Sequence, residues 1–311
     1  MKKTIIKRLG QMVVVLFGIS FITFFLTYLA PGDPATAMYE SMGITPTQEV
    51  LEQTRENMGL NRSFAEQYAA WLTGCLQGDF GESFSKNAPV LELLIKRLPA
   101  TFRLSLLSLL FMTVVSVPLG IFSAVKSDRI PDFLIRGFTF IGISLPGFVV
   151  GLMLLYFLGL KLHLLPIANN STGFQQMLLP ALTLAFAMAS KYTRQVRTAV
   201  LEELSQDYVV GAKARGLSRS MILWKHVLVN ALLPLITMFG LSFGSLLGGT
   251  AVVEIIFNYP GLGILAVSAV QNRDYPLIQG FVLWIAFIYM LVNLVVDISY
   301  DLIDPRIREE K

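Results

Sequence analysis

The chain has 311 residues, of which 54% are hydrophobic and only 15% are charged, with a net charge of +4. About a quarter of the residues in a soluble globular domain are charged, so this composition excludes such a domain and indicates a membrane protein. One cysteine excludes an intrachain disulfide framework, and the two histidines are too far apart to form a ligand cluster. We therefore expect no metal site, no cofactor and no nucleic-acid partner for this chain.

Six charge-free apolar runs are each long enough to cross a membrane, which takes about 20 residues per helix. They are residues 9–30, 104–125, 137–160, 164–190, 227–253 and 275–296. The fourth run exceeds one helix, and we place its span near 177–194. Pro118 and Pro146 fall inside the second and third runs, where we expect them to kink a helix without breaking it. The sequence predicts an all-α bundle of about six transmembrane helices.

The first run resembles a secretory signal peptide, because it follows two pairs of basic residues and precedes a small-residue stretch near Ala35. Its apolar part is 22 residues long, however, whereas signal peptides have about 7–15. We therefore expect residues 1–30 to be a short cytoplasmic terminus and a retained first helix.

The positive charges predict the orientation of the chain. The amino terminus, residues 126–136, residues 191–226 and the tail together carry 17 of the 25 Lys and Arg residues. Because short cytoplasmic loops are enriched in these residues, both termini should be cytoplasmic. Residues 31–100 then form a long external segment, residues 191–226 a cytoplasmic one and residues 304–311 a cytoplasmic tail. We call the two long connections the 31–100 segment and the 191–226 segment.

Helical spacing predicts short helices in the 31–100 segment, one beginning near Thr47 and another carrying Tyr68 and Trp71. This segment is either a small lid folded on the bundle or a docking surface for a delivery protein, and the two interpretations are compatible.

Signatures of catalysis and nucleotide binding are absent from the sequence. There is no phosphate-binding loop, no His-Glu-x-x-His and no complete Gly-x-Ser-x-Gly, so we expect no enzyme activity. The spans contain almost no charge, and we interpret Glu254 as a polar cap near the external end of the fifth span. Ion-coupled carriage or a channel therefore has no visible machinery, although it remains the alternative function.

Two features point to close packing and to coupling. Gly240, Gly244 and Gly248 form a stripe on which a second helix could approach closely. In the 191–226 segment, apolar spacing predicts an amphipathic helix over 201–214, and Gly216 is placed where a helix commonly ends with a left-handed glycine.

Residues 201–234 resemble the signature loop of permease subunits in binding-protein-dependent ATP-binding-cassette (ABC) importers. Gly211, Ala212 and Gly216 match its small positions, whereas Val210 stands where the general signature has Glu. This departure, and the sequence around Asp207-Tyr208, resemble the dipeptide, oligopeptide and nickel subfamily.

Six further motifs resemble the first of the two permeases in that subfamily. They are Ala30-Pro31-Gly32-Asp33-Pro34, Gly78-Asp79-Phe80-Gly81, Leu98-Pro99-Ala100-Thr101, Pro260-Gly261-Leu262-Gly263, Arg273-Asp274-Tyr275-Pro276 and Asp304-Pro305-Arg306.

The resemblance implies a type I ABC importer permease in a bacterial inner membrane, with residues 101–303 as its five-helix core. It implies a second, similar permease, two cytoplasmic ATPases that bind ATP and Mg, and an external solute-binding protein. The imported solute would be nickel, free or chelated, or short peptides. Contact with the ATPase is implied for Asp207, Tyr208, Gly211, Ala212, Arg215 and Gly216.

Overall fold

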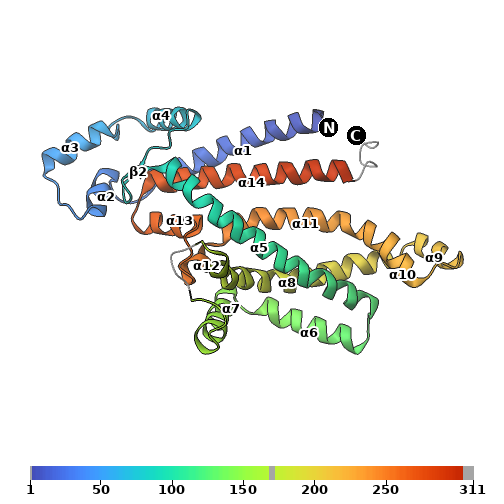
Figure 1. Ribbon diagram of the computed structural model, residues 1–311. Helices are drawn as coiled ribbons and strands as arrows, with labels where there is room; N and C mark the ends of the chain where they lie inside the picture. Colours follow the sequence, from blue (N-terminus) through green and yellow to red (C-terminus); the bar gives the residue numbers. More distant parts are fainter. Residues whose placement is uncertain (1, 168–171, 304–311) are drawn as a thin grey trace. The chain divides into compact units, whose positions relative to one another are not determined.

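A computed structural model describes residues 2–167 and 172–303 and confirms the all-helical class (Figure 1). The predicted tail at 304–311 lies outside the described residues. The chain divides into two compact units, the first made of residues 102–259 and 292–303, the second of residues 2–101 and 260–291. Two long helices, α5 (Val90–Val125) and α14 (Tyr275–Ile303), contribute residues to both units.

The second unit contains the first helix and the whole 31–100 segment. The elements that lie entirely within it are α1 (Lys2–Leu29), α2 (Pro34–Ser41), α3 (Gln48–Asn57), α4 (Phe64–Leu76), β1 (Glu82–Ser83), β2 (Ala88–Pro89) and α13 (Leu262–Gln271). The strands form an antiparallel pair in which Ser83 faces Ala88.

Side-chain caps explain where the short helices of the 31–100 segment begin. Thr47 accepts a hydrogen bond from the backbone of Val50 at the start of α3, and Ser63 forms a capping box with Glu66 at the start of α4. Both helices predicted in this segment are confirmed. At the start of α2, the Asp33 carboxylate accepts a hydrogen bond from the backbone N–H of Thr36.

Motifs that are far apart in the sequence meet in the second unit. The Asp274 carboxylate is fully buried and accepts hydrogen bonds from the Ser83 hydroxyl at 2.6 Å and from the Ser85 hydroxyl and N–H at 2.8 and 3.0 Å. The Thr101 hydroxyl accepts a hydrogen bond of 2.7 Å from the N–H of Leu262. Because buried polar groups need such partners, these bonds fix the β1–β2 hairpin and the loop before α13.

The first unit is a helical bundle that ends in the 191–226 segment. Its elements are α6 (Ile130–Ser144), α7 (Gly147–Leu154), the π-helix η1 (Leu155–Lys161), α8 (Phe174–Leu204), α9 (Asp207–Ala214), α10 (Arg219–Ile222), the π-helix η2 (Leu223–Val227), α11 (Leu228–Gly249) and α12 (Ala251–Ile256). Helices α6, α7 and α11 each pack against α8. Figure 1 shows α9 and α10 at the end of α8 and α11 away from α12.

The six predicted spans coincide with α1, α5, the α6–η1 pair, α8, α11 and α14. By length and composition, three helices in the described part of the chain could cross a membrane, or four if the bent α6–η1 pair is one span. The number six therefore remains a prediction for α8, which carries several cations, and for α11.

One expectation for the third span is wrong. The helix continues through Pro118, but it is broken at Pro146, and the two halves lie at 100° to each other. Leu145 has an extended backbone with φ −84° and ψ 127°. Proline disfavours helical geometry in the residue before it, and its ring lacks the N–H that the helix needs, which explains the break.

Candidate functional site

The 191–226 segment carries the predicted site residues on a short helix with defined ends. Helix α9 has an acidic residue, Asp207, in its first turn and a basic one, Lys213, in its last, as the helix dipole favours. Beyond it, the N–H of Gly216 donates to Lys213 and that of Leu217 donates to Ala212, at 3.0 and 3.2 Å. These two bonds form a Schellman motif, which requires a left-handed residue. Gly216 has φ +78°, so its predicted geometry is confirmed.

The expected continuous helix over 201–214 is wrong, because α8 ends at Leu204 and α9 begins at Asp207. The Ser205 hydroxyl donates a hydrogen bond of 2.7 Å back to the carbonyl of Glu202. Gln206 is extended, with φ −73° and ψ 150°. Serine competes in this way with helical hydrogen bonding, so the segment turns and starts a new helix.

The inner face of α9 packs on the core of the first unit. Val209 and Ala212 are buried, and Tyr208 packs partly buried beside them. The same core contains Val196 and Val200 of α8, together with Ile222 and Val227 of the following elements. The apolar spacing thus identified the face of α9 that packs on the core of the first unit. It did not identify a face that is free to bind a partner.

The Tyr208 hydroxyl donates a hydrogen bond of 2.7 Å to the Glu203 carboxylate. Burial and this bond raise the pKa of Tyr208, so the phenol stays a donor at neutral pH. The contact ties α9 to the end of α8.

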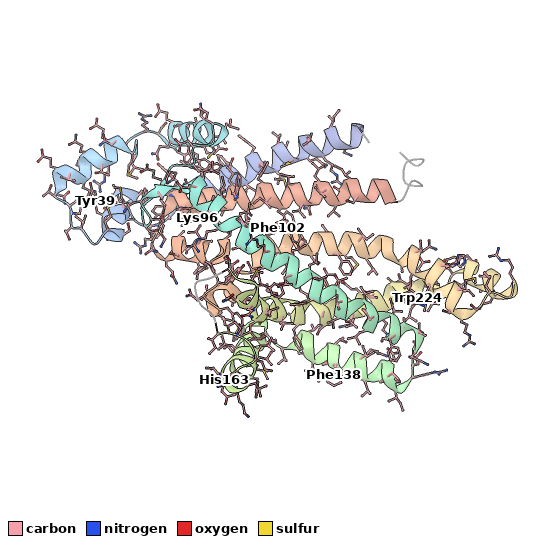
Figure 2. The ribbon with its side chains drawn as sticks, in the orientation of Figure 1. Tyr39, Lys96, Phe102, Phe138, His163 and Trp224 are labelled. Atoms are coloured by element: carbon pink, nitrogen blue, oxygen red, sulfur yellow. The ribbon has the colours of Figure 1, made fainter. Side chains whose placement is uncertain are left out.

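The outer face of the 191–226 segment exposes three large apolar side chains that the sequence interpretation did not select for a site, namely Val210, Met221 and Trp224. Val210 and Trp224 are each 62% exposed, and Trp224 projects near α10 in Figure 2. Exposed basic residues accompany them, namely Lys213, Arg215, Arg219 and Lys225. Of the predicted coupling residues, Asp207, Gly211, Arg215 and Gly216 are on this exposed surface, whereas Tyr208 and Ala212 support it from inside. One sequence signal could have indicated this exposed apolar surface, because Val210 stands where the general signature has Glu.

A buried ion pair holds α6 against α8, the helix that leads into α9. Asp132 is fully buried and accepts hydrogen bonds from Arg197 at 2.7 Å to Nε and 2.8 Å to Nη2. Its oxygens also accept bonds from the Ser123 hydroxyl and from the N–H of Asp128. Such a bidentate geometry is the strongest form of a carboxylate–guanidinium contact. Arg197 therefore has a structural role, although its charge counted toward the predicted orientation.

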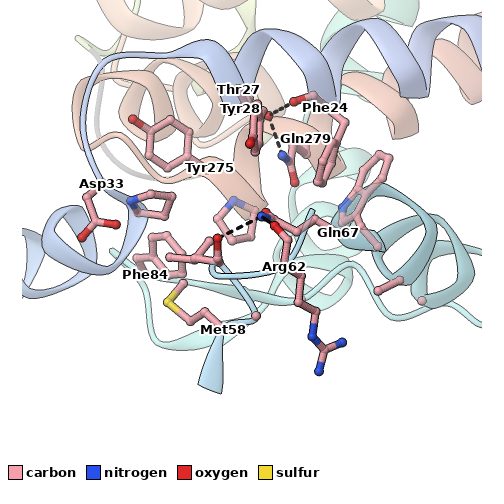
Figure 3. A pocket seen from close by; sticks show the side chains of 18 of the residues that line it. Phe24, Thr27, Tyr28, Asp33, Met58, Arg62, Gln67, Phe84, Tyr275 and Gln279 are labelled. Carbon is pink, nitrogen blue, oxygen red and sulfur yellow. Dashed lines mark hydrogen bonds between the residues drawn. The ribbon is translucent and has the colours of Figure 1, made fainter. Parts of the chain in front are cut away.

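The 31–100 segment contributes to a cavity of about 530 Å³ inside the second unit (Figure 3). Aromatic side chains line it, among them Phe24, Trp71 and Tyr275, and the Gln279 amide donates to Thr27 at 2.6 Å along one wall. A cavity of this size is within the range of ligand pockets.

Asp33, at the edge of this cavity, is already partnered. Burial raises its pKa, but hydrogen bonds from Thr36 and the charge of Arg55 outweigh that effect and hold the pKa below its usual value. The Arg55 Nε atom is 3.2 Å from the carboxylate.

The predicted glycine stripe divides into two parts. A Cβ on Gly240 would collide with Val296 of α14, so the two helices approach closely there. Gly244 is buried, whereas no atom of the described residues lies within 4 Å of a Cβ placed on Gly248. Among the described residues, close packing is therefore present at Gly240 and absent at Gly248.

Glu254 is not the polar cap expected at an interface. The structure buries it completely, and its carboxylate accepts a hydrogen bond of 2.8 Å from the Thr250 hydroxyl. As for metals, no group of three or more His, Cys, Asp or Glu side chains that could hold an ion occurs among residues 2–167 and 172–303.

Comparison with known families gives matches along nearly the whole chain. Residues 116–309 match the family described as binding-protein-dependent transport system inner membrane component. Residues 1–105 match the N-terminal family of the same transport system membrane components.

Individual relatives match over almost their full lengths. The probable peptide ABC transporter permease protein y4tP of Sinorhizobium fredii is 38% identical, and the alignment covers 98% of each chain. The dipeptide transport system permease protein DppB of Escherichia coli is 35% identical over 100% of each chain. The glutathione transport system permease protein GsiC of Escherichia coli is 38% identical over 98% of each chain.

Among solved structures, an inward-facing form of the MetNI methionine ABC transporter has a similar fold. The TM-score is 0.55 at 18% identity, over 68% of this chain and 96% of that one. At this identity, the similarity supports the fold of the bundle alone.

Proposed function

Because this chain belongs to the family of binding-protein-dependent transport system inner membrane components, we propose that it is a membrane-spanning subunit of an importer for short peptides. One observation carries the proposal: the three relatives named above have peptide, dipeptide and glutathione in their names, and they match at least 98% of the chain. The match includes the 31–100 segment. None of the three names nickel, so peptides are the better-supported solute.

The family assignment separates transport from ATP hydrolysis. The chain is a transport subunit and not an enzyme, and hydrolysis belongs to separate ATP-binding subunits. We propose that the importer has two such subunits, carrying ATP and Mg, and that one of them docks on the exposed face of the 191–226 segment around Val210 and Trp224. An apolar centre with a basic rim is a typical composition for a protein interface.

The remaining partners follow from the same premise. We propose that a second permease completes the path, and that a solute-binding protein delivers peptide to the 31–100 segment. The chain would lie in a bacterial inner membrane with both termini in the cytoplasm. Alternating access would follow if ATP-driven closure of the ATPases moved α9, which Tyr208 and the buried core connect to α8. An ion-coupled carrier is the alternative function.

Growth of a bacterial strain that lacks this chain tests the solute. The strain should also be auxotrophic for one amino acid, which is supplied only within a dipeptide or tripeptide. We expect growth to depend on a plasmid copy of the chain, while growth on the free amino acid does not. A second arm measures accumulation of radioactive nickel in the same cells. Restored nickel accumulation without peptide-dependent growth would contradict the proposal.

A further inference from the structure

A cavity of about 460 Å³, open to the surface, lies among α6, α8 and α11 in the first unit, and four of the side chains that α8 contributes to it are exposed. Its volume is in the range of about 300–1,000 Å³ that ligand pockets commonly have. Ile143 of α6 and Met238 of α11 contribute apolar surface, and the rest of the lining comes from α8. These residues of α8, within 191–202, begin the 191–226 segment, so the cavity lies where the fourth predicted span meets that segment.

The wall formed by α8 is a polar stripe. Its polar members recur at helical spacing and are Lys191, Arg194, Gln195, Thr198 and Glu202. The opposite face of the same helix is apolar and buried, with Tyr192, Val196 and Val200 in the core. Because residues three, four and seven apart share a helix face, the polar side chains point together into the cavity.

The charges in this stripe form no ion pair with a described residue, although the Lys191 ammonium lies 5.9 Å from the centre of the Tyr192 ring. Among the residues described by the structure, no ion pair involves Lys191, Arg194 or Glu202, whereas Arg197 on the same helix is bound to Asp132. The Gln195 side-chain oxygen is buried and receives no hydrogen bond from the described residues. Lys191 and Arg194 lie at the end of the predicted fourth span, 177–194, and charged side chains in a membrane bundle commonly face a water-filled cavity and mark the route of a solute. An unpartnered buried oxygen is costly unless a ligand or water supplies the donor.

The arrangement of charge is complementary to a zwitterion. Arg194 and Glu202 are eight positions apart, which corresponds to about 12 Å along a helix. An extended peptide advances about 3.3–3.6 Å per residue, so its two termini are about 12 Å apart when it has three or four residues. The long side chains could reach toward each other to bind shorter peptides.

We propose that this cavity is a peptide-binding station on the solute path. Lys191 and Arg194 bind the carboxylate terminus of the peptide, Glu202 binds its ammonium terminus, and Gln195 accepts a backbone N–H. The inference rests on the proposed function, since it names the site through which the same peptides pass. An anionic phospholipid headgroup fits less well, because Glu202 would repel it.

The test is equilibrium dialysis of radiolabelled trialanine, and of its C-terminal amide, against the purified nucleotide-free complex without the delivery protein. We expect Arg194→Gln and Lys191→Gln to weaken binding of trialanine at least tenfold and to leave binding of the amide within about twofold. Glu202→Gln should weaken binding of trialanine but not of its N-acetyl derivative. Arg129→Gln is the matched control, since Arg129 is an exposed cation that does not line this cavity.

A structural role for these residues would weaken the binding of both peptides equally, and that result would overturn the inference. So would undetectable binding to the wild-type complex, or loss of co-purified phosphatidylglycerol from Arg194→Gln without a change in peptide binding. ATP-driven uptake of trialanine by the wild-type complex is measured in parallel. Uptake with unaltered binding in the variants would overturn the binding station alone, whereas absence of uptake would overturn the proposed function and this inference with it.

Discussion

Replacing Arg197 should destabilise the first unit because it strands a buried charge. Arg197→Met removes the donors at 2.7 and 2.8 Å from Asp132, whose side chain is 0% exposed. Removing one partner of a buried ion pair costs about 3–5 kcal/mol. Hydrogen bonds from Ser123 and Asp128 survive, so we expect the lower end of this range, about 3 kcal/mol.

A second substitution shows whether the stranded charge is the cause. Asp132→Asn keeps an acceptor oxygen for Ser123 and Asp128 but removes the negative charge. Combined with Arg197→Met, it should recover at least half of the lost free energy of unfolding. Alone it should cost less than Arg197→Met, because Arg197 is 18% exposed and its charge can reach water.

The free energy of unfolding can be measured by circular dichroism of the purified chain in mixed micelles as the fraction of denaturing detergent is raised. The four proteins of the double-mutant cycle are compared under identical conditions. If the double variant is as unstable as Arg197→Met, the stranded charge of Asp132 is not the cause of the lost stability. A single Arg197→Met variant within about 0.5 kcal/mol of the wild type would refute the reasoning outright.

Three other predictions concern coupling, packing and topology. Gly216→Val should weaken docking of the ATP-binding subunits and abolish transport while the chain still inserts, because φ +78° strains a β-branched residue. Gly216→Asn is the control and should retain most function, since asparagine tolerates this conformation. Normal transport by the valine variant would exclude a coupling role. Gly240→Leu should block assembly or transport, since its side chain would collide with α14; wild-type yield and uptake would show that the helices separate easily. Impermeant maleimide added to sealed cells should label a single cysteine placed at Glu52, whereas one placed at Ser218 should react only after the cells are opened. Labelling of both in sealed cells would contradict the topology. Native Cys75 should not react with the maleimide, because burial and the charge of Asp79 raise its pKa to about 12.

Helix ends could be predicted from the sequence where a few neighbouring residues determine them. Thr47 and Ser63 cap helices in the 31–100 segment, and Gly216 ends α9 in the left-handed conformation expected of it. The prediction of an unbroken third span failed because hydrophobicity and the backbone restriction before a proline favour different structures there. A hydrophobic run of membrane length continues past Pro146, but the restriction on Leu145 breaks the helix there.

Contacts between distant residues could not be predicted from one sequence. Asp274 binds Ser83 across 191 positions, and Arg197 binds Asp132 across 65. The motifs that contain Asp274 and Ser83 were noticed, but nothing local showed that they meet. The cation count used for orientation likewise treated Arg197 and Arg194 alike, although one is paired in the core and the other lines a cavity.

Uptake of a radiolabelled dipeptide by proteoliposomes tests most directly whether this chain belongs to an ATP-driven peptide importer. The vesicles contain this chain, its partner permease and the ATP-binding subunits, with the delivery protein outside and ATP with Mg inside. We predict uptake that stops when ATP is replaced by a non-hydrolysable analogue, when the delivery protein is omitted, or when this chain is left out. Uptake driven by a proton or sodium gradient in vesicles without the ATP-binding subunits would contradict the account.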